Sequence, residues 1–281
     1  MRATFIEIDG IPTRYFHAGA GFPILLLHGV GMAADSWVKN IPALAERYAV
    51  FAPDLLGSGF TGAGPAGPEA PQRAIVKHLT KLIDRLVIER FAVVGSSLGG
   101  LIATLLYFTM PERVRALAVV GSAALLAAPP AELRAVFEAS YRNGIRAFAD
   151  NSLATNRQRL TNIVVDPASL PEAVLMMQLC AYALPGAREA YERRLQGLIA
   201  SLDGNPTAWV SHRLSDVHAP MLAIAGREDP RTNPTWEAAA MAKVPHGRAV
   251  TIDGCGHFPH LEHPDAFHRL IFDFLGTPAR G

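Results

Sequence analysis

Short apolar runs alternate with longer helical patterns along the first half of the chain. Thr4–Ile8 and Thr13–Phe16 flank an Asp-Gly turn, which predicts an antiparallel hairpin. Further short apolar runs predict strands that are buried on both faces, as in a parallel sheet. These runs are Ile24–Leu27, Ala49–Ala52, Phe91–Val94 and Val114–Val120. Later in the chain, Met221–Ala225 and Arg248–Ile252 are also predicted strands.

The segments between these runs have helical periodicity. Arg73–Ile88 places apolar residues three and four positions apart, which predicts one apolar stripe. Leu98–Met110 is apolar almost all round and predicts a central, covered helix. Thr235–Ala242 and Pro264–Leu275 are also predicted helices. Alternation of this kind predicts an α/β fold with a mostly parallel sheet and helices on both faces.

The alternation stops in the middle of the chain, where no clear buried strand is found. This part has four helical patterns, which are Ala131–Arg142, Ile145–Ala154, Pro171–Ala183 and Ala187–Leu202. We therefore expect residues 1–123 and 216–281 to form one core and residues 124–215 to form an inserted helical cap.

Composition narrows the class of protein. The 281 residues include 26 Lys and Arg against 25 Asp and Glu, so the net charge is only +1. Nucleic-acid and membrane-surface proteins rely on an excess of positive charge, so neither partner is expected. Two cysteines are too few for a disulfide framework, and no signal sequence or bilayer-long apolar stretch is evident. A cytoplasmic globular protein is predicted, and its oligomeric state stays open.

The strongest chemical signal is Gly95-Ser96-Ser97-Leu98-Gly99, between a predicted strand and a predicted helix. A serine on such a sharp turn is lifted clear of the sheet at a helix N-terminus, where negative charge is favoured. Glycines on both sides allow strand and helix to approach closely. Ser97 is therefore the candidate nucleophile.

A serine hydroxyl needs a base, and the base needs an orienting carboxylate. His257 and Asp229 each follow a predicted strand, at the sheet edge where α/β proteins place their ligands. Glu228 is the alternative carboxylate. For the oxyanion, the backbone N–H groups of Leu98 and Val30 are the candidate donors, because Val30 lies in a glycine-containing loop after a strand.

His260, His263 and His268 follow His257 closely and raise the question of a metal site. Pro259 and Pro264 prevent one helix face from presenting these histidines together, and no suitable pair of acidic ligands is adjacent. No metal is therefore expected.

The sequence resembles α/β-hydrolases of the Ser-His-Asp type with a helical cap. The resemblance is carried by LLLHGVG, PDLLGSGFT, VVGSSLGG, AGREDP and GCGHFPHLEHP, which together extend over most of the chain. It implies a Ser97–His257–Asp229 triad, an acyl-enzyme intermediate and no cofactor. It also implies that the chain is neither a haloalkane dehalogenase nor an epoxide hydrolase, because both have aspartate where Ser97 stands.

Three functions remain as hypotheses. The simplest is hydrolysis of a carboxylic ester or lactone through an acyl-enzyme on Ser97. The alternative is carbon–carbon bond hydrolysis of a ring-fission dienoate, because the sequence also resembles meta-cleavage-product hydrolases. It departs from them at Val30-Gly31-Met32, at Ser96 in place of asparagine and at Phe258 in place of tryptophan. The third is a non-hydrolytic binding protein on the same fold.

The predicted substrate is a small molecule with a largely apolar acyl group. The cap is rich in Leu, Val and Met, which suit an apolar pocket. Trp37, Phe60, Ser96 and Phe258 are further candidates for this pocket. The cap arginines Arg142, Arg146, Arg157 and Arg159 are interpreted mainly as surface residues, with anchoring of a substrate carboxylate as the alternative.

Overall fold

The computed structural model describes residues 1–65, 67–204 and 209–276. Within them, eight strands form one sheet in the order β1-β2-β4-β3-β5-β6-β7-β8. The strands β3 to β8 are parallel, whereas β2 is antiparallel to both β1 and β4. The strands are β1 Arg2–Ile8, β2 Ile11–Ala18, β3 Pro23–Leu27, β4 Ala49–Pro53, β5 Phe91–Ser96, β6 Val114–Val120, β7 Met221–Gly226 and β8 Gly247–Ile252.

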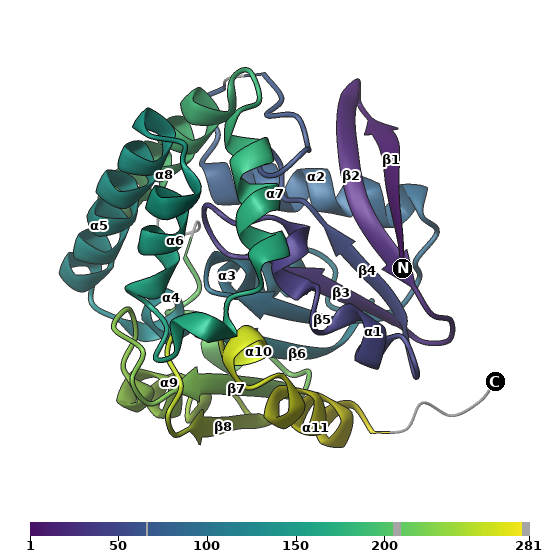
Figure 1. The fold of residues 1–281 in the computed structure, drawn as a ribbon. Helices are drawn as coiled ribbons and strands as arrows, with labels where there is room; N and C mark the ends of the chain where they lie inside the picture. Colours follow the sequence, from purple (N-terminus) through teal and green to yellow (C-terminus); the bar gives the residue numbers. More distant parts are fainter. Residues whose placement is uncertain (66, 205–208, 277–281) are drawn as a thin grey trace.

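Helices cover both faces of this sheet (Figure 1). Along β3, Leu25 and Leu27 pack into one apolar cluster, whereas Ile24 and Leu26 pack into another on the opposite face. The first cluster includes α2 Pro71–Arg85, α3 Leu98–Thr109 and α9 Pro234–Met241. The second includes α1 Ile41–Leu44 and α11 Pro264–Leu275. This double covering explains why the inner strands are apolar at consecutive positions, and the predicted fold is confirmed.

Between β6 and β7 the described residues form five α-helices, which we call the helical insertion (Ala123–Gly204). They are α4 Ala123–Ala127, α5 Pro130–Ala149, α6 Leu153–Thr161, α7 Glu172–Tyr182 and α8 Ala187–Gly204. Figure 1 shows them gathered at one end of the sheet, away from α11. Short 3₁₀ segments and one further helix complete the described elements: η1 Ala34–Trp37, η2 Pro167–Ser169, η4 Leu214–Asp216 and α10 Pro259–Glu262.

Two predicted helix boundaries are wrong. The predicted helix Ile145–Ala154 is interrupted after Ala149, and a separate helix begins at Leu153. The sequence predicts a helix break at Asn143-Gly144, but α5 continues through both residues to Ala149. The reason for the glycine is packing, because a Cβ at Gly144 would lie 2.3 Å from the Tyr191 ring on α8. Gly144 thus allows α5 and α8 to approach closely. Among the described residues, no helix is both long and apolar enough to span a bilayer.

Candidate active site

Ser97 lies on the sharp turn between β5 and α3. Its φ of 51° is in the left-handed region, which a residue with a Cβ adopts only when its surroundings enforce it. Two hydrogen bonds do so here. The Ser97 N–H donates to the Val120 carbonyl at 2.8 Å, and the Ser122 hydroxyl donates to the Ser97 carbonyl at 3.0 Å. The strained turn is therefore fixed to the end of the neighbouring strand β6.

Glycines make this turn possible. A Cβ at Gly95 would lie 2.1 Å from the Gly99 carbonyl oxygen, and a Cβ at Gly99 would lie 2.2 Å from the Leu27 carbonyl oxygen. Both distances are too short for any side chain. Gly29 approaches from β3, since a Cβ there would come within 3.1 Å of the Ser97 Cβ. The loop that carries Val30 is therefore next to Ser97.

His257 and Asp229 are in contact at the carboxyl ends of β8 and β7. Asp229 Oδ2 lies 2.7 Å from His257 Nδ1, and both side chains are buried. The other oxygen, Oδ1, accepts the backbone N–H of Arg231 at 2.8 Å. A proton on Nδ1 is thus held by the carboxylate, which leaves Nε2 free to act as a base.

Glu228, the alternative carboxylate, turns elsewhere. Its Oε2 accepts the backbone N–H of Cys255 at 3.0 Å and braces the loop that precedes His257. The structure therefore brings Asp229, and not Glu228, to His257. This agrees with the order of preference derived from the sequence.

Glu262 is a residue of this site that the sequence analysis missed. Its carboxylate accepts the backbone N–H groups on both sides of His257, from Gly256 at 2.9 Å and from Phe258 at 3.0 Å. It also accepts the N–H of Val165 in the helical insertion at 2.8 Å. The backbone N–H of His257 itself donates to Ile163 in the insertion at 2.7 Å. The histidine loop is thus fixed to both the core and the insertion.

Ser97 and His257 line one small cavity. Its volume is about 20 Å³, which is room for about one water molecule. Its other walls are mostly apolar and come from the core and from α4 and α5. They comprise Val30, Leu98, Gly121, Leu125, Val136, Phe137, Ser140 and Arg231. The cavity therefore contains both candidate oxyanion residues and is closed by the helical insertion.

None of the four predicted pocket residues lines this cavity. For Trp37, Ser96 and Phe258 the prediction is corrected, because their side chains are buried in the protein, whereas for Phe60 it stays a prediction. Trp37 is fully buried in the core, where its ring lies 4.3 Å from the His260 ring. Phe258 packs into a small apolar cluster between the core and the insertion. Ser96 is buried at the end of β5, and its hydroxyl has no hydrogen-bond partner among the described residues. Phe60 lines a neighbouring hollow of about 380 Å³ and stacks on the Arg14 guanidinium.

Three arginines are the least expected feature: Arg231 lines the Ser97 cavity, Arg159 lies close to Arg231, and Arg194 lines two larger hollows. Arg159 and Arg194 belong to the helical insertion and are buried, whereas Arg231 follows Asp229 in the core. Arg159 donates to the Gly31 carbonyl at 2.9 Å, and Arg194 donates to the Leu56 carbonyl at 2.8 Å. The interpretation of Arg159 as a surface residue is therefore wrong. None of the described ion pairs includes any of these three arginines.

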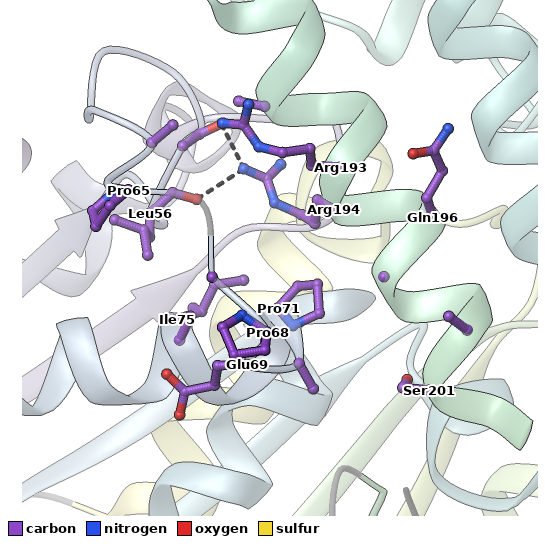
Figure 2. A pocket seen from close by; sticks show the side chains of 18 residues that line it. Leu56, Pro65, Pro68, Glu69, Pro71, Ile75, Arg193, Arg194, Gln196 and Ser201 are labelled. Carbon is purple, nitrogen blue, oxygen red and sulfur yellow. Dashed lines mark hydrogen bonds between the residues drawn. The ribbon is translucent and has the colours of Figure 1, made fainter. Parts of the chain in front are cut away.

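Figure 2 shows a larger hollow, of about 810 Å³, between α8 and the loop that leads into α2. In this view Arg194 is turned towards the chain at Leu56, and Pro68 and Pro71 lie on the opposite side. Ser97 and His257 do not line it. This hollow is therefore separate from the Ser97 cavity, although its volume is larger.

Four other histidines, His28, His260, His263 and His268, have separate surroundings. His28 contacts the Gly29 carbonyl and the Leu55 N–H, and burial lowers its pKa to about 4. Burial also lowers the pKa of His260, to about 3. His263 contacts the Gly254 carbonyl, and His268 contacts Asn40. Among the described residues, no three His, Cys, Asp or Glu side chains are grouped so that they would hold a metal ion.

Comparison with known proteins agrees with this geometry. The family model described as the alpha/beta hydrolase family matches residues 24–270. The chain belongs to this family. It is a hydrolase, as predicted from the sequence, because relatives of this chain are named hydrolases. The hypothesis of a non-hydrolytic binding protein is therefore set aside.

Two curated relatives and one solved structure illustrate this similarity. The chain is 30% identical to a 2-hydroxymuconate semialdehyde hydrolase of Pseudomonas sp. strain CF600, over 95% of this chain and 91% of that protein. It is 28% identical to a 2-hydroxy-6-oxononadienedioate/2-hydroxy-6-oxononatrienedioate hydrolase of Cupriavidus pinatubonensis, over 92% of this chain and 89% of that protein. A solved meta-cleavage product hydrolase from Pseudomonas fluorescens IP01 has a TM-score of 0.77 at 24% identity, with 97% of both chains covered. This last likeness concerns the fold alone.

Proposed function

We propose that the protein hydrolyses a carbon–carbon bond in a 2-hydroxy-6-oxo-dienoate or a similar ring-fission product. The observation that carries this proposal is the similarity to hydrolases that are named for such substrates. This reverses the order derived from the sequence, in which ester or lactone hydrolysis ranked first.

In this proposal Ser97 is the nucleophile, His257 is the base and Asp229 orients the imidazole. The Ser97 hydroxyl adds to the ketone carbonyl and gives its proton to His257 Nε2. The N–H groups of Leu98 and Val30 stabilise the oxyanion that forms. Both residues line the Ser97 cavity, which supports this assignment.

Before this addition the substrate changes from its dienol to its keto form, which moves the 2-hydroxyl proton to the carbon next to the 6-oxo group. The bond between these two carbons then breaks, and its electron pair passes into the conjugated 2-oxo enoate. The dienolate that forms is protonated to a 2-hydroxy-dienoate. This conjugation is what makes a carbon atom acceptable as a leaving group. The acyl group stays on Ser97 until water, activated by His257, releases it as a carboxylic acid. Overall, one water molecule is added across the broken bond.

We further propose that residues 124–215 act as a cap that excludes bulk water from the acyl-enzyme. The contacts of Leu125, Phe137 and Ser140 with the Ser97 cavity support this role. Exclusion of water strengthens the interactions with the oxyanion.

The test is a direct comparison of substrates. The visible absorbance of a 2-hydroxy-6-oxo-dienoate should fall on addition of the protein and should stay constant with Ser97→Ala. Its kcat/KM should exceed that of 4-nitrophenyl esters with a matched acyl group. Rapid hydrolysis of those esters without loss of the dienoate absorbance would overturn the proposal and restore the ester hypothesis.

A further inference from the structure

The side chain of Arg231 lies in the wall of the Ser97 cavity, opposite residues of the helical insertion. Together with His257 it supplies the ionisable groups of the described lining, whose other members are mostly apolar. Its Nη1 donates to the Ser140 hydroxyl on α5 at 3.1 Å. The guanidinium is thus oriented by a neutral group of the helical insertion.

No described acidic side chain forms an ion pair with this guanidinium. Asp229 is close, but its oxygens are used by His257 and by the backbone of Arg231. The neighbouring phenols provide no charge, since burial raises the pKa of Tyr191 and of Tyr182 above their usual value.

A second guanidinium makes the local charge more positive. Burial lowers the pKa of Arg231, and the nearby charge of Arg159 lowers it further. Arg159 is held by the Gly31 carbonyl, and its Nε has no partner among the described residues. An arginine stays protonated near neutral pH in spite of such shifts. Uncompensated positive charge in an apolar site is costly, and an anionic ligand would relieve that cost.

We propose that Arg231, oriented by Ser140, binds a carboxylate of the substrate beside Ser97 and selects anionic over neutral acyl compounds. A guanidinium can form two parallel hydrogen bonds to a carboxylate, so this subsite fixes orientation as well as charge. The inference rests on the proposed function only for the identity of the substrate, since the dienoates named for the relatives are themselves carboxylates. Because Ser140 belongs to the insertion and Arg231 to the core, the bound anion joins the two.

The experiment uses a matched pair of esters, 4-nitrophenyl hydrogen succinate and 4-nitrophenyl butyrate, which differ at the acyl end by a carboxylate. The wild type should prefer the succinate ester. In Arg231→Met this preference, as a ratio of kcat/KM values, should fall roughly tenfold to a hundredfold. Arg231→Lys should retain part of the preference, and Ser140→Ala should reduce it less than Arg231→Met does. Arg142→Met is the control, because Arg142 is an exposed arginine on α5, the helix that carries Ser140. This change should leave the preference for the succinate ester unchanged.

Binding gives a second measurement that is independent of turnover. Calorimetry on the Ser97→Ala protein should detect succinate binding, and the further change Arg231→Met should weaken it by a similar factor. Equal losses of activity on both esters, with unchanged succinate binding, would show that Arg231 is structural and would overturn the proposal. So would an unchanged preference in Arg231→Met.

The two proposals can fail separately. If the wild type leaves a dienoate intact but shows a preference for the anionic ester that depends on Arg231, the carbon–carbon activity is wrong and the subsite stands. If the dienoate is cleaved equally well by wild type and Arg231→Met, the activity stands and the subsite is wrong.

Discussion

Replacing Asp229 by asparagine tests the assignment of the triad most directly. The carboxylate oxygen lies 2.7 Å from His257 Nδ1, in a pair that is 6% and 3% exposed. With an effective dielectric constant of about 20, a carboxylate at this distance stabilises the imidazolium by about 6 kcal/mol. An amide lacks this charge, and it also favours the tautomer with a proton on Nε2, which cannot accept the proton of Ser97. We expect kcat to fall by about four orders of magnitude.

The assay follows the loss of dienoate absorbance and, in parallel, the rate of labelling of Ser97 by a fluorophosphonate. Glu228→Gln is the matched control, since it changes the adjacent carboxylate, which only accepts the N–H of Cys255. It should keep kcat within about tenfold and lower stability by less than about 1 kcal/mol, because the amide oxygen of glutamine can still accept this N–H. If Glu228→Gln were the more damaging of the two, or if Asp229→Asn kept a tenth of the activity, the assignment of Asp229 would be refuted.

Three further changes test other parts of the structure. Gly95→Ala should lower the free energy of unfolding, measured by urea denaturation, by about 3 kcal/mol or more, because the added Cβ would meet the Gly99 carbonyl. Gly67→Ala is the control, because a Cβ at Gly67 would lie in open space, and it should change this free energy by less than about 0.5 kcal/mol. Between pH 6.5 and about 3, His260 is protonated in the unfolded chain but not in the folded chain, so the free energy of unfolding decreases as the pH is lowered. On going from pH 7 to pH 4.5, His260→Leu should lose about 2–3 kcal/mol less of this free energy than the wild type does. The control His246→Asn, at an exposed position, should lose as much as the wild type. Glu262→Gln should cost about 1–3 kcal/mol of stability and should lower kcat, because one of the two carboxylate oxygens is replaced by an NH2 group that cannot accept a backbone N–H beside His257. An unchanged melting temperature would contradict that role.

The strands and the nucleophile turn were predictable because their signals are local. The segments at β3, β5 and β6 are apolar at consecutive positions, as strands covered on both faces must be. The glycines around Ser97 report a backbone geometry that few other sequences allow. Asp229 and His257 could be placed at the same sheet edge because each directly follows a strand.

The walls of the cavity were not predictable in this way. Phe258 is adjacent to His257 in sequence, but neighbouring side chains leave the backbone in different directions, and its ring enters another cluster. Trp37 is equally suited to a pocket or a core by its chemistry, and only the packing of its 3₁₀ segment against α10 and α11 decides for the core. Arg231 meets Ser140 across 91 positions of sequence, and no local pattern encodes that contact.

The long excursion of the chain between β6 and β7 has a consequence for biosynthesis. One hundred residues separate the end of β6 at Val120 from the start of β7 at Met221. At about 5–20 residues per second, a ribosome needs roughly 5–20 s to translate them. Throughout that interval β6 is the unpaired edge of a nascent apolar sheet, which is a template for misassociation. The interval is when a holdase chaperone would be of most use to this polypeptide.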